Sequence, residues 1–144
     1  MVLSTLRLKN QLLSSLPDAE WPYWHPWLEC VDLPAGKLLY ESGSAIHHVY
    51  FPLTALVSLY HVTESGATAE VALVGHEGVV GVSSFMGGRG SISHAVVLCA
   101  GQALQLPSSV IRRRFEQSSQ VQSLMLCYTQ ALIGQMAHTA VCNR

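Results

Sequence analysis

Between residues 30 and 106 the sequence consists of short apolar runs of four to seven residues, separated by turn residues. Many short strands at such a spacing are typical of a β-sandwich or a barrel-like fold. Because no helical segment separates the runs, we expect the sheets to be antiparallel. The expected strands are CVDL (30–33), KLLY (37–40), HVYF (48–51), LVSLYHV (56–62), AEVALV (69–74), GVVGV (78–82), HAVVLCA (94–100) and ALQL (103–106).

Helical patterns flank this β region on both sides. Residues 4–16 place five leucines near helical spacing, with Ser4 at the start of the segment and Pro17 after its end. These features predict one helix that Ser4 caps and Pro17 terminates. The segment WPYWHPW (21–27) predicts a turn or broken helix fixed by aromatic burial. A short helix is predicted over residues 110–117.

A long helix is predicted from about residue 119 to 141, because this stretch contains neither proline nor a turn cluster. Side chains at alternating steps of four and three form a coiled-coil-like seam. The seam consists of Val121, Met125, Tyr128, Leu132, Gln135 and Thr139. Apolar residues on other faces indicate a helix that is buried, or one that packs on both its own domain and a partner. We expect the first four seam residues to form the interface of a homodimer.

The composition excludes several classes of protein. Hydrophobic residues make up 49% of the chain and charged residues 12%, which excludes disorder and indicates that a partner covers some apolar surface. The net charge of −1 offers no basic face for nucleic acid. The three consecutive residues Arg112, Arg113 and Arg114 are expected on the solvated side of their helix, with Glu116 pairing with Arg112 or Arg113.

No chemistry-bearing motif stands out among the reactive residues. The four cysteines are widely spaced, and the seven histidines are scattered, so we expect no metal site. No nucleophile elbow, zinc-protease motif or phosphate-binding loop is present, and we do not expect an enzyme. The chain also lacks a secretory signal and an apolar run of membrane-spanning length. The expectation is a cytoplasmic protein with reduced thiols and no contact with the membrane.

The segments LPAGKLLYESGSAIHHVYFPLTALVSL (33–59) and VALVGHEGVVGVSSFMGG (71–88) resemble the effector domains of the Crp/Fnr family of bacterial transcription regulators. NQLLSSLP (10–17) and YTQALIGQMAHTAVCNR (128–144) are similar to the opening and to the dimerisation helix of these domains. The resemblance covers nearly the whole chain. It implies a mainly β fold with flanking helices, namely an antiparallel double-stranded β-helix or jelly roll, followed by a long C-terminal helix.

The same resemblance implies the organisation of the parent protein. Residues 1–118 would form a cyclic-nucleotide-binding-like roll with its N-terminal helix, and residues 119–144 the dimerisation helix. A winged helix-turn-helix that reads DNA as a dimer would follow beyond residue 144 and is absent from this chain. DNA binding is therefore expected only through that missing domain.

The family's cyclic-nucleotide binders hold the ribose with a Glu that follows a Gly, and the cyclic phosphate with an Arg that precedes a Ser or Thr. Here Gly81 is followed by Val82 and Ser83, and the clamp positions fall near Ser93 and His94. Both charged anchors are absent. Loss of such an Arg from a buried phosphate site costs about 3–5 kcal/mol by analogy with broken buried ion pairs. Tight cyclic-nucleotide binding is not expected, although a nucleotide remains an alternative if Arg89 replaces the clamp.

These considerations give a candidate pocket and two hypotheses. The predicted ligand-binding residues are Gly81, Val82, Ser83, Ser84, Arg89, Ser91, Ser93, His94 and Tyr128, with Phe85, Met86, Ile92 and Val96 completing an apolar lining. The first hypothesis is a sensor domain that binds a small-molecule effector, cyclic nucleotide or other, and transmits binding through the dimer helix. The alternative is a degenerate, ligand-free scaffold that serves protein–protein interaction and dimerisation, with the same side chains filling the roll.

Overall fold

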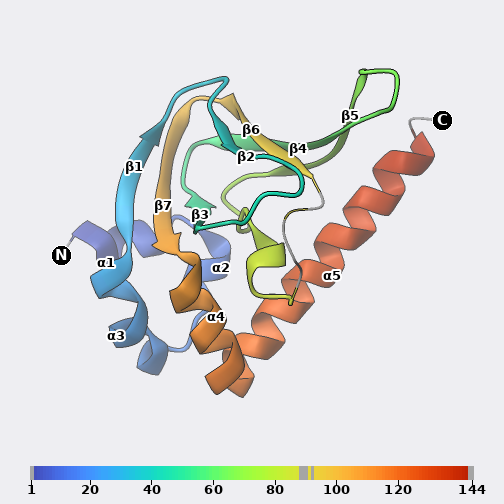
Figure 1. The fold of residues 1–144 in the computed structure, drawn as a ribbon. Coiled ribbons are helices and arrows are strands. Elements are labelled where there is room, and N and C mark those ends of the chain that lie inside the picture. Colours follow the sequence, from blue (N-terminus) through green and yellow to red (C-terminus); the bar gives the residue numbers. More distant parts are fainter. Residues whose placement is uncertain (1, 88–90, 92, 143–144) are drawn as a thin grey trace.

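The structure is a computed structural model that describes residues 2–87, 91 and 93–142 (Figure 1). Two antiparallel sheets form a roll. The first has the strand order β1 (Glu29–Leu33), β7 (Gly101–Pro107) and β3 (His48–Pro52). The second has the order β2 (Leu38–Tyr40), β6 (His94–Cys99), β4 (Leu56–Val62) and β5 (Thr68–Val74). Every strand pair is antiparallel, which confirms the predicted β-roll.

The alternation of side chains along the strands decides which face of each sheet is buried. On β6, Ala95 and Val97 point into the roll and are buried, whereas Leu98 is exposed on the outside. The first sheet is buried on both faces: Val49, Phe51, Leu104 and Leu106 pack against the helices in one apolar cluster, and Tyr50 and Ala103 join the second sheet in another cluster inside the roll. The predicted helices therefore close one side of a β core.

One predicted strand is absent. The run GVVGV (78–82) forms only a single bridge, in which the amides of Tyr50 and Val80 donate to each other's carbonyl oxygens at 3.1 and 2.8 Å. Gly81 follows with a φ of 110°, a left-handed conformation that ends any extended run. The chain then enters the short 3₁₀ turn η3 (Val82–Ser84). The prediction of a strand here was wrong because apolar character alone does not distinguish a buried loop from a strand.

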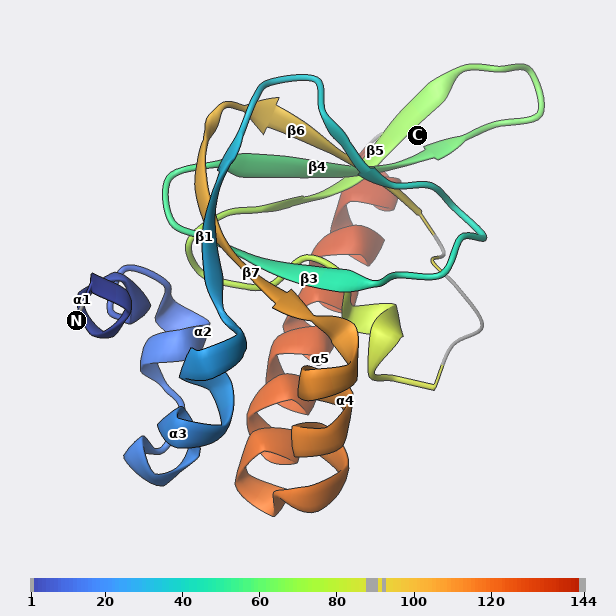
Figure 2. The same cartoon turned by 60° about the vertical axis from the view of Figure 1, so that its left-hand side comes forward.

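The N-terminal region is a set of short helices rather than one helix over residues 4–16. They lie to one side of β1 and β7 (Figure 2). Their order is α1 (Val2–Arg7), α2 (Gln11–Ser14), η1 (Asp18–Glu20), α3 (Trp21–Trp24) and η2 (His25–Trp27). Ser4 lies inside α1 and caps nothing. The break falls at Asn10, whose extended backbone begins a second helix.

Asn10 joins three parts of the chain and is completely buried. Its Oδ1 accepts hydrogen bonds from the amides of Leu12 and Leu13, both at 3.0 Å, and so caps α2. Its Nδ2 donates to the carbonyl oxygens of Pro52 and Gly78, both at 2.9 Å. One side chain thus holds the N-terminal helices against the end of β3 and against the loop that precedes the η3 turn.

The helix α4 (Ser108–Gln117) is fixed to the N-terminal helices by a buried ion pair. Arg114 donates through Nε and Nη2 to the two carboxylate oxygens of Glu20 at 2.9 and 2.8 Å, and its guanidinium lies 3.9 Å from the ring centre of Tyr23. The hydrogen bonds from Arg114 hold the pKa of Glu20 below its usual value. The prediction of three solvated arginines therefore fails for Arg114. Within the described residues, Glu116 forms no ion pair with Arg112 or Arg113.

The helix α5 (Ser119–Cys142) runs from α4 along the open side of the roll to β5 (Figures 1 and 2). The predicted long helix is confirmed, but its seam meets a different surface from the expected one. Val121 and Met125 are completely buried in the chain's own core, and Leu132 is only 6% exposed. Burial of each such side chain contributes roughly 1.5–3 kcal/mol. Assigning these three residues to a dimer interface was wrong, because they pack on the chain's own core.

None of the helices in the described ranges combines the length and the apolar character needed to cross a membrane.

We predict that Asn10→Ala lowers the free energy of unfolding by about 3 kcal/mol, because the carbonyl oxygens of Pro52 and Gly78 lose their donor and α2 loses its cap. Urea unfolding of the wild-type and variant chains measures the difference. The neighbouring exposed Gln11→Ala substitution is the control and should change stability by less than about 0.5 kcal/mol. A loss below about 1 kcal/mol for Asn10→Ala would contradict the linking role.

Candidate ligand-binding site

A cavity of about 200 Å³ lies between the interior of the roll and α5. The roll contributes residues from β2 and β4, from the loop over residues 79–86 and from the segment just ahead of β6, and α5 contributes four. The described lining consists of Tyr40, Leu59, Val79, Gly81, Val82, Ser83, Met86, Ser91, Ser93, Thr129, Leu132, Ile133 and Met136. The lining therefore connects the β-roll directly with the long helix.

Hydroxyl groups supply most of the polar character of this cavity, and internal hydrogen bonds already engage several of them. The Ser91 hydroxyl donates to the carbonyl oxygen of Ser93 and accepts from the Ser93 amide at 3.1 Å. The Thr129 hydroxyl donates to the Met125 carbonyl oxygen at 2.7 Å within α5. Among the described residues, no buried side-chain nitrogen or oxygen lacks a partner. The described lining contains no charged side chain.

Two partly buried tyrosines near the cavity lie in surroundings of low polarity. Burial raises the pKa of Tyr40 to about 12, and a hydrogen bond with Ser91 opposes only part of this rise. Burial also raises the pKa of Tyr128, whose hydroxyl donates to the Val79 carbonyl oxygen at 3.2 Å. A medium that disfavours phenolate also disfavours other unpaired charges.

Tyr128 fixes α5 against the loop behind the cavity. A Cβ atom at position 78 would overlap the Tyr128 ring, so the ring packs directly on the glycine backbone. Such a close approach requires the absence of a side chain at Gly78. Asn10 holds the same loop from the other direction through the Gly78 carbonyl oxygen. Tyr128 itself is not among the residues that line the cavity, contrary to the prediction.

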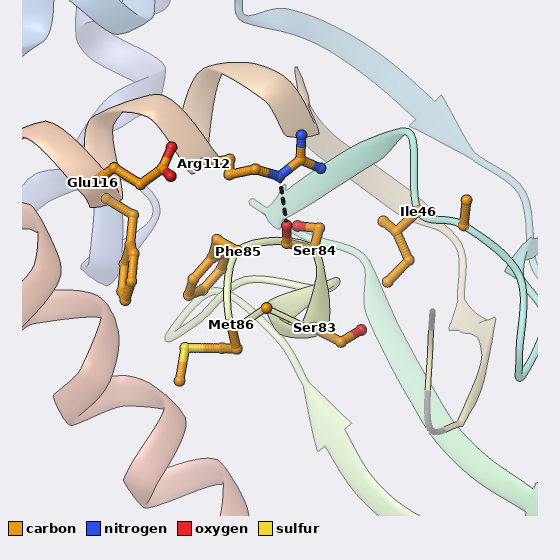
Figure 3. Close-up of a pocket in the computed structure, with 10 residues that line it drawn as sticks. Ile46, Ser83, Ser84, Phe85, Met86, Arg112 and Glu116 are labelled. Atoms are coloured by element: carbon orange, nitrogen blue, oxygen red, sulfur yellow. Dashed lines mark hydrogen bonds between the residues drawn. The ribbon is translucent and has the colours of Figure 1, made fainter. Parts of the chain in front are cut away.

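A second hollow, of about 550 Å³, lies outside the roll between the η3 turn and α4 (Figure 3). Its described lining is Ala45, Ile46, Ser83, Ser84, Phe85, Met86, Gly87, Arg112, Phe115 and Glu116. Arg112 donates through Nε to the Ser84 carbonyl oxygen at 3.0 Å. The ring centres of Phe85 and Phe115 lie 5.3 Å apart. Because Ser83 and Met86 line both spaces, residues 82–86 separate the inner cavity from the outer groove, and we call this segment the wall turn.

The structure distributes the predicted pocket residues over several places. Gly81, Val82, Ser83, Ser91 and Ser93 line the inner cavity, together with Met86 from the predicted apolar set. Ser84 and Phe85 line the outer groove instead. Arg89 and Ile92 lie outside the described residues.

His94 and Val96 were placed in the pocket wrongly, because both lie on the outer face of their sheet. The His94 ring stacks on Tyr60 with ring centres 4.9 Å apart, and its Nδ1 accepts a hydrogen bond from the Ser42 amide at 3.3 Å. Val96 lines a hollow on that outer face with Tyr60. Alternate residues of a strand point to opposite faces, so the side chain next to Ser93 cannot share its direction.

Several cavity residues were missed by the sequence analysis. Tyr40 and Leu59 come from β2 and β4, and three further residues, Thr129, Ile133 and Met136, come from α5. The helical residues lie beside the predicted seam, at one or four positions from its members. Once the seam is known to face the roll, this spacing would place them at the cavity.

The sequence model of the family described as "Cyclic nucleotide-binding domain" matches residues 30–118, more than half of the chain. The chain belongs to this family. A curated relative, the global nitrogen regulator of Nostoc sp. (strain PCC 7120), is 28% identical over 117 residues. That match covers 75% of this chain and 52% of the relative, so the chain spans about half of the relative's length.

Solved structures of regulator domains share the fold. The sensor domain of the transcriptional regulator DNR from Pseudomonas aeruginosa matches with a TM-score of 0.72 and 15% identity, over 95% of this chain and 92% of that one. The N-terminal domain of a transcriptional regulator from Streptomyces coelicolor A3(2) matches with a TM-score of 0.64 and 18% identity, over 94% of each chain. Together with the family match, these likenesses confirm the predicted Crp/Fnr-type effector-domain fold.

We predict that Tyr40→Phe flattens the loss of stability at alkaline pH. Because the folded-state pKa of about 12 exceeds the ordinary value of 10.0, this group's contribution is complete below pH 10.0 and is lost as the pH rises toward 12. Two pKa units correspond to roughly 2.7 kcal/mol. Urea unfolding at several pH values from about 9 to 12 measures the effect. Parallel stability curves for the two proteins would show that the phenol is not desolvated.

Proposed function

We propose that this domain senses a small molecule in the inner cavity and passes its occupancy to a DNA-binding domain through α5, as part of a Crp/Fnr-type transcription regulator. One observation carries the proposal: roll and helix are opposite walls of the same cavity. The relatives named as transcription regulators support the regulatory role. In the full-length protein, which we place in the cytoplasm, DNA binding would belong to residues outside this chain.

The lining explains how occupancy reaches the helix. An occupant contacts Leu132 and Met136 on α5 and Val82 on the wall turn at the same time. A ligand shifts a conformational equilibrium only by the difference in its affinity for the two states. The shape of the cavity depends on how α5 lies against the roll. Two positions of α5 would therefore give cavities that bind an occupant with different affinities. Because the occupant would contact α5 directly, no other residues are needed to couple ligand binding to the position of the helix.

We further propose that the outward face of α5 forms the interface of a homodimer. Leu126, Gln130, Ile133 and Ala137 repeat the alternating steps of four and three on a side of the helix away from the buried seam, and all four are exposed. Leu126 is 42% exposed and Ile133 is 59% exposed in the single chain. Two large apolar side chains seven residues apart on an exposed face are typical of a helix that pairs with a second helix. Ile133 also lines the cavity, so ligand and partner would meet at one side chain.

The test of this interface is the pair Leu126→Asp and Ala131→Asp in the purified domain. Leu126→Asp buries a charge at the proposed contact and should raise the dimer dissociation constant about 100-fold or more, which corresponds to about 2.8 kcal/mol. Ala131 is exposed on another side of α5, so Ala131→Asp is the matched control and should leave association unchanged. Sedimentation velocity over a concentration series measures both.

Both substitutions are at exposed positions and should change the free energy of unfolding by less than about 0.5 kcal/mol. A dimer that tolerates Leu126→Asp, or a wild-type chain that is monomeric at every concentration, would contradict this use of α5.

A further inference from the structure

We infer that the occupant of the inner cavity is a small, uncharged, apolar molecule of about the size of benzene or toluene. The inference rests on the proposed function, in which this cavity is the effector site. Its size, the internal hydrogen bonds of its Ser91 and Thr129 hydroxyls and the character of its mouth each support this chemical class.

The volume sets the first limit. Pockets for drug-sized ligands and cofactors usually measure about 300–1,000 Å³. This cavity, at about 200 Å³, is smaller than that range. An apolar protein cavity of about 150 Å³ accommodates benzene. The available space therefore fits one aromatic ring or a compact branched aliphatic molecule, and not a nucleoside with its phosphate.

The polar groups set the second limit. A site built for a polar ligand presents donors or acceptors that stay unpaired until the ligand arrives. Here the Ser91 hydroxyl bonds to the Ser93 backbone, and the Thr129 hydroxyl donates to the Met125 carbonyl oxygen. The described lining contains no cation for a phosphate or carboxylate. Among these described residues a charged occupant would find no counter-charge to replace its hydration, whereas an apolar occupant needs none.

The mouth of the cavity provides the third argument. Two residues of the lining, Met86 and Ile133, are large apolar side chains that are 40% and 59% exposed. They come from the wall turn and from α5, and they mark where the lining reaches solvent in the single chain, before a partner covers Ile133. Methionine has three flexible torsions and adapts to different apolar shapes. An apolar rim of this kind favours entry of an uncharged molecule between the turn and the helix.

The experiment is a thermal-shift titration of the domain with toluene, with benzoate and cAMP as charged comparisons. At ten times its dissociation constant, toluene should raise the melting temperature by about 3–6 °C, and the charged compounds should raise it by less than about 1 °C. No shift with toluene up to its solubility limit would overturn the inference. A shift with benzoate or cAMP that equals or exceeds the shift with toluene would also overturn it.

Two substitutions locate the binding. Val82→Phe fills the cavity and should weaken toluene binding at least tenfold, whereas the control Leu98→Phe, on the exposed outer face of β6, should leave it unchanged. If Val82→Phe does not fold, Met136→Ala serves instead. It enlarges the cavity and should raise the affinity for naphthalene relative to toluene at least fivefold. Unchanged binding by Val82→Phe, or an unchanged size preference of Met136→Ala, would place the ligand elsewhere and contradict the inference.

A wrong ligand class and a wrong proposed function would give different results in these experiments. Toluene binding that leaves the dimer dissociation constant unchanged would contradict transmission through α5 and support the ligand class. Absence of toluene binding in a dimer that Leu126→Asp still disrupts would refute the ligand class and leave the proposed interface standing.

Discussion

The contact between α5 and the roll is the interaction on which the rest of this structure depends. Val121 and Met125 anchor the first half of the helix in the core, and Leu132 anchors its second half inside the roll. The inner cavity exists because this contact is incomplete between the helix and the wall turn. The apolar face that remains exposed on α5 is a consequence of the same contact, since the buried seam fixes the rotation of the helix.

The loop that carries the wall turn is held at three points by different kinds of interaction. Asn10 binds the Gly78 carbonyl oxygen, the Tyr128 ring lies on the Gly78 backbone, and Arg112 binds the Ser84 carbonyl oxygen. Two of these contacts come from the N-terminal helix region and from α4, which the Glu20–Arg114 ion pair joins. A buried ion pair of this geometry specifies how the two helical regions meet rather than adding much net stability. Elements remote in sequence thus set the dimensions of the site.

The sequence predicted most strands, the long helix and the family, because alternation of apolar residues reports directly on burial. It did not predict the break at Asn10, since the hydrogen bonds that stabilise the break reach residues 42 and 68 positions away. The seam of α5 showed that a partner surface exists, yet its spacing is the same for a second helix and for the chain's own roll. The spacing of the apolar residues therefore identified which face of α5 makes contacts. It did not show whether that face meets the chain's own roll or a second helix.

The site was predictable in part, and the errors have a simple geometric origin. Ser91 and Ser93 line the cavity, whereas His94 does not, because a shift of one residue along a strand reverses the direction of the side chain. The volume of the cavity is set by residues on separate helices and strands, so it cannot be predicted from the spacing of residues along the sequence. The absence of the family's charged anchors was visible in the sequence, and the apolar cavity of the structure agrees with it.

The position of Gln135 limits how α5 can move. Its side-chain oxygen accepts a hydrogen bond from the Leu73 amide at 2.9 Å, and β5 is the last strand of its sheet. An uncovered edge strand is a template for pairing with other chains. The helix therefore also protects this edge. Complete release of α5 would expose β5 to aggregation, so the proposed signal would be restricted to a small pivot or slide that keeps the edge covered.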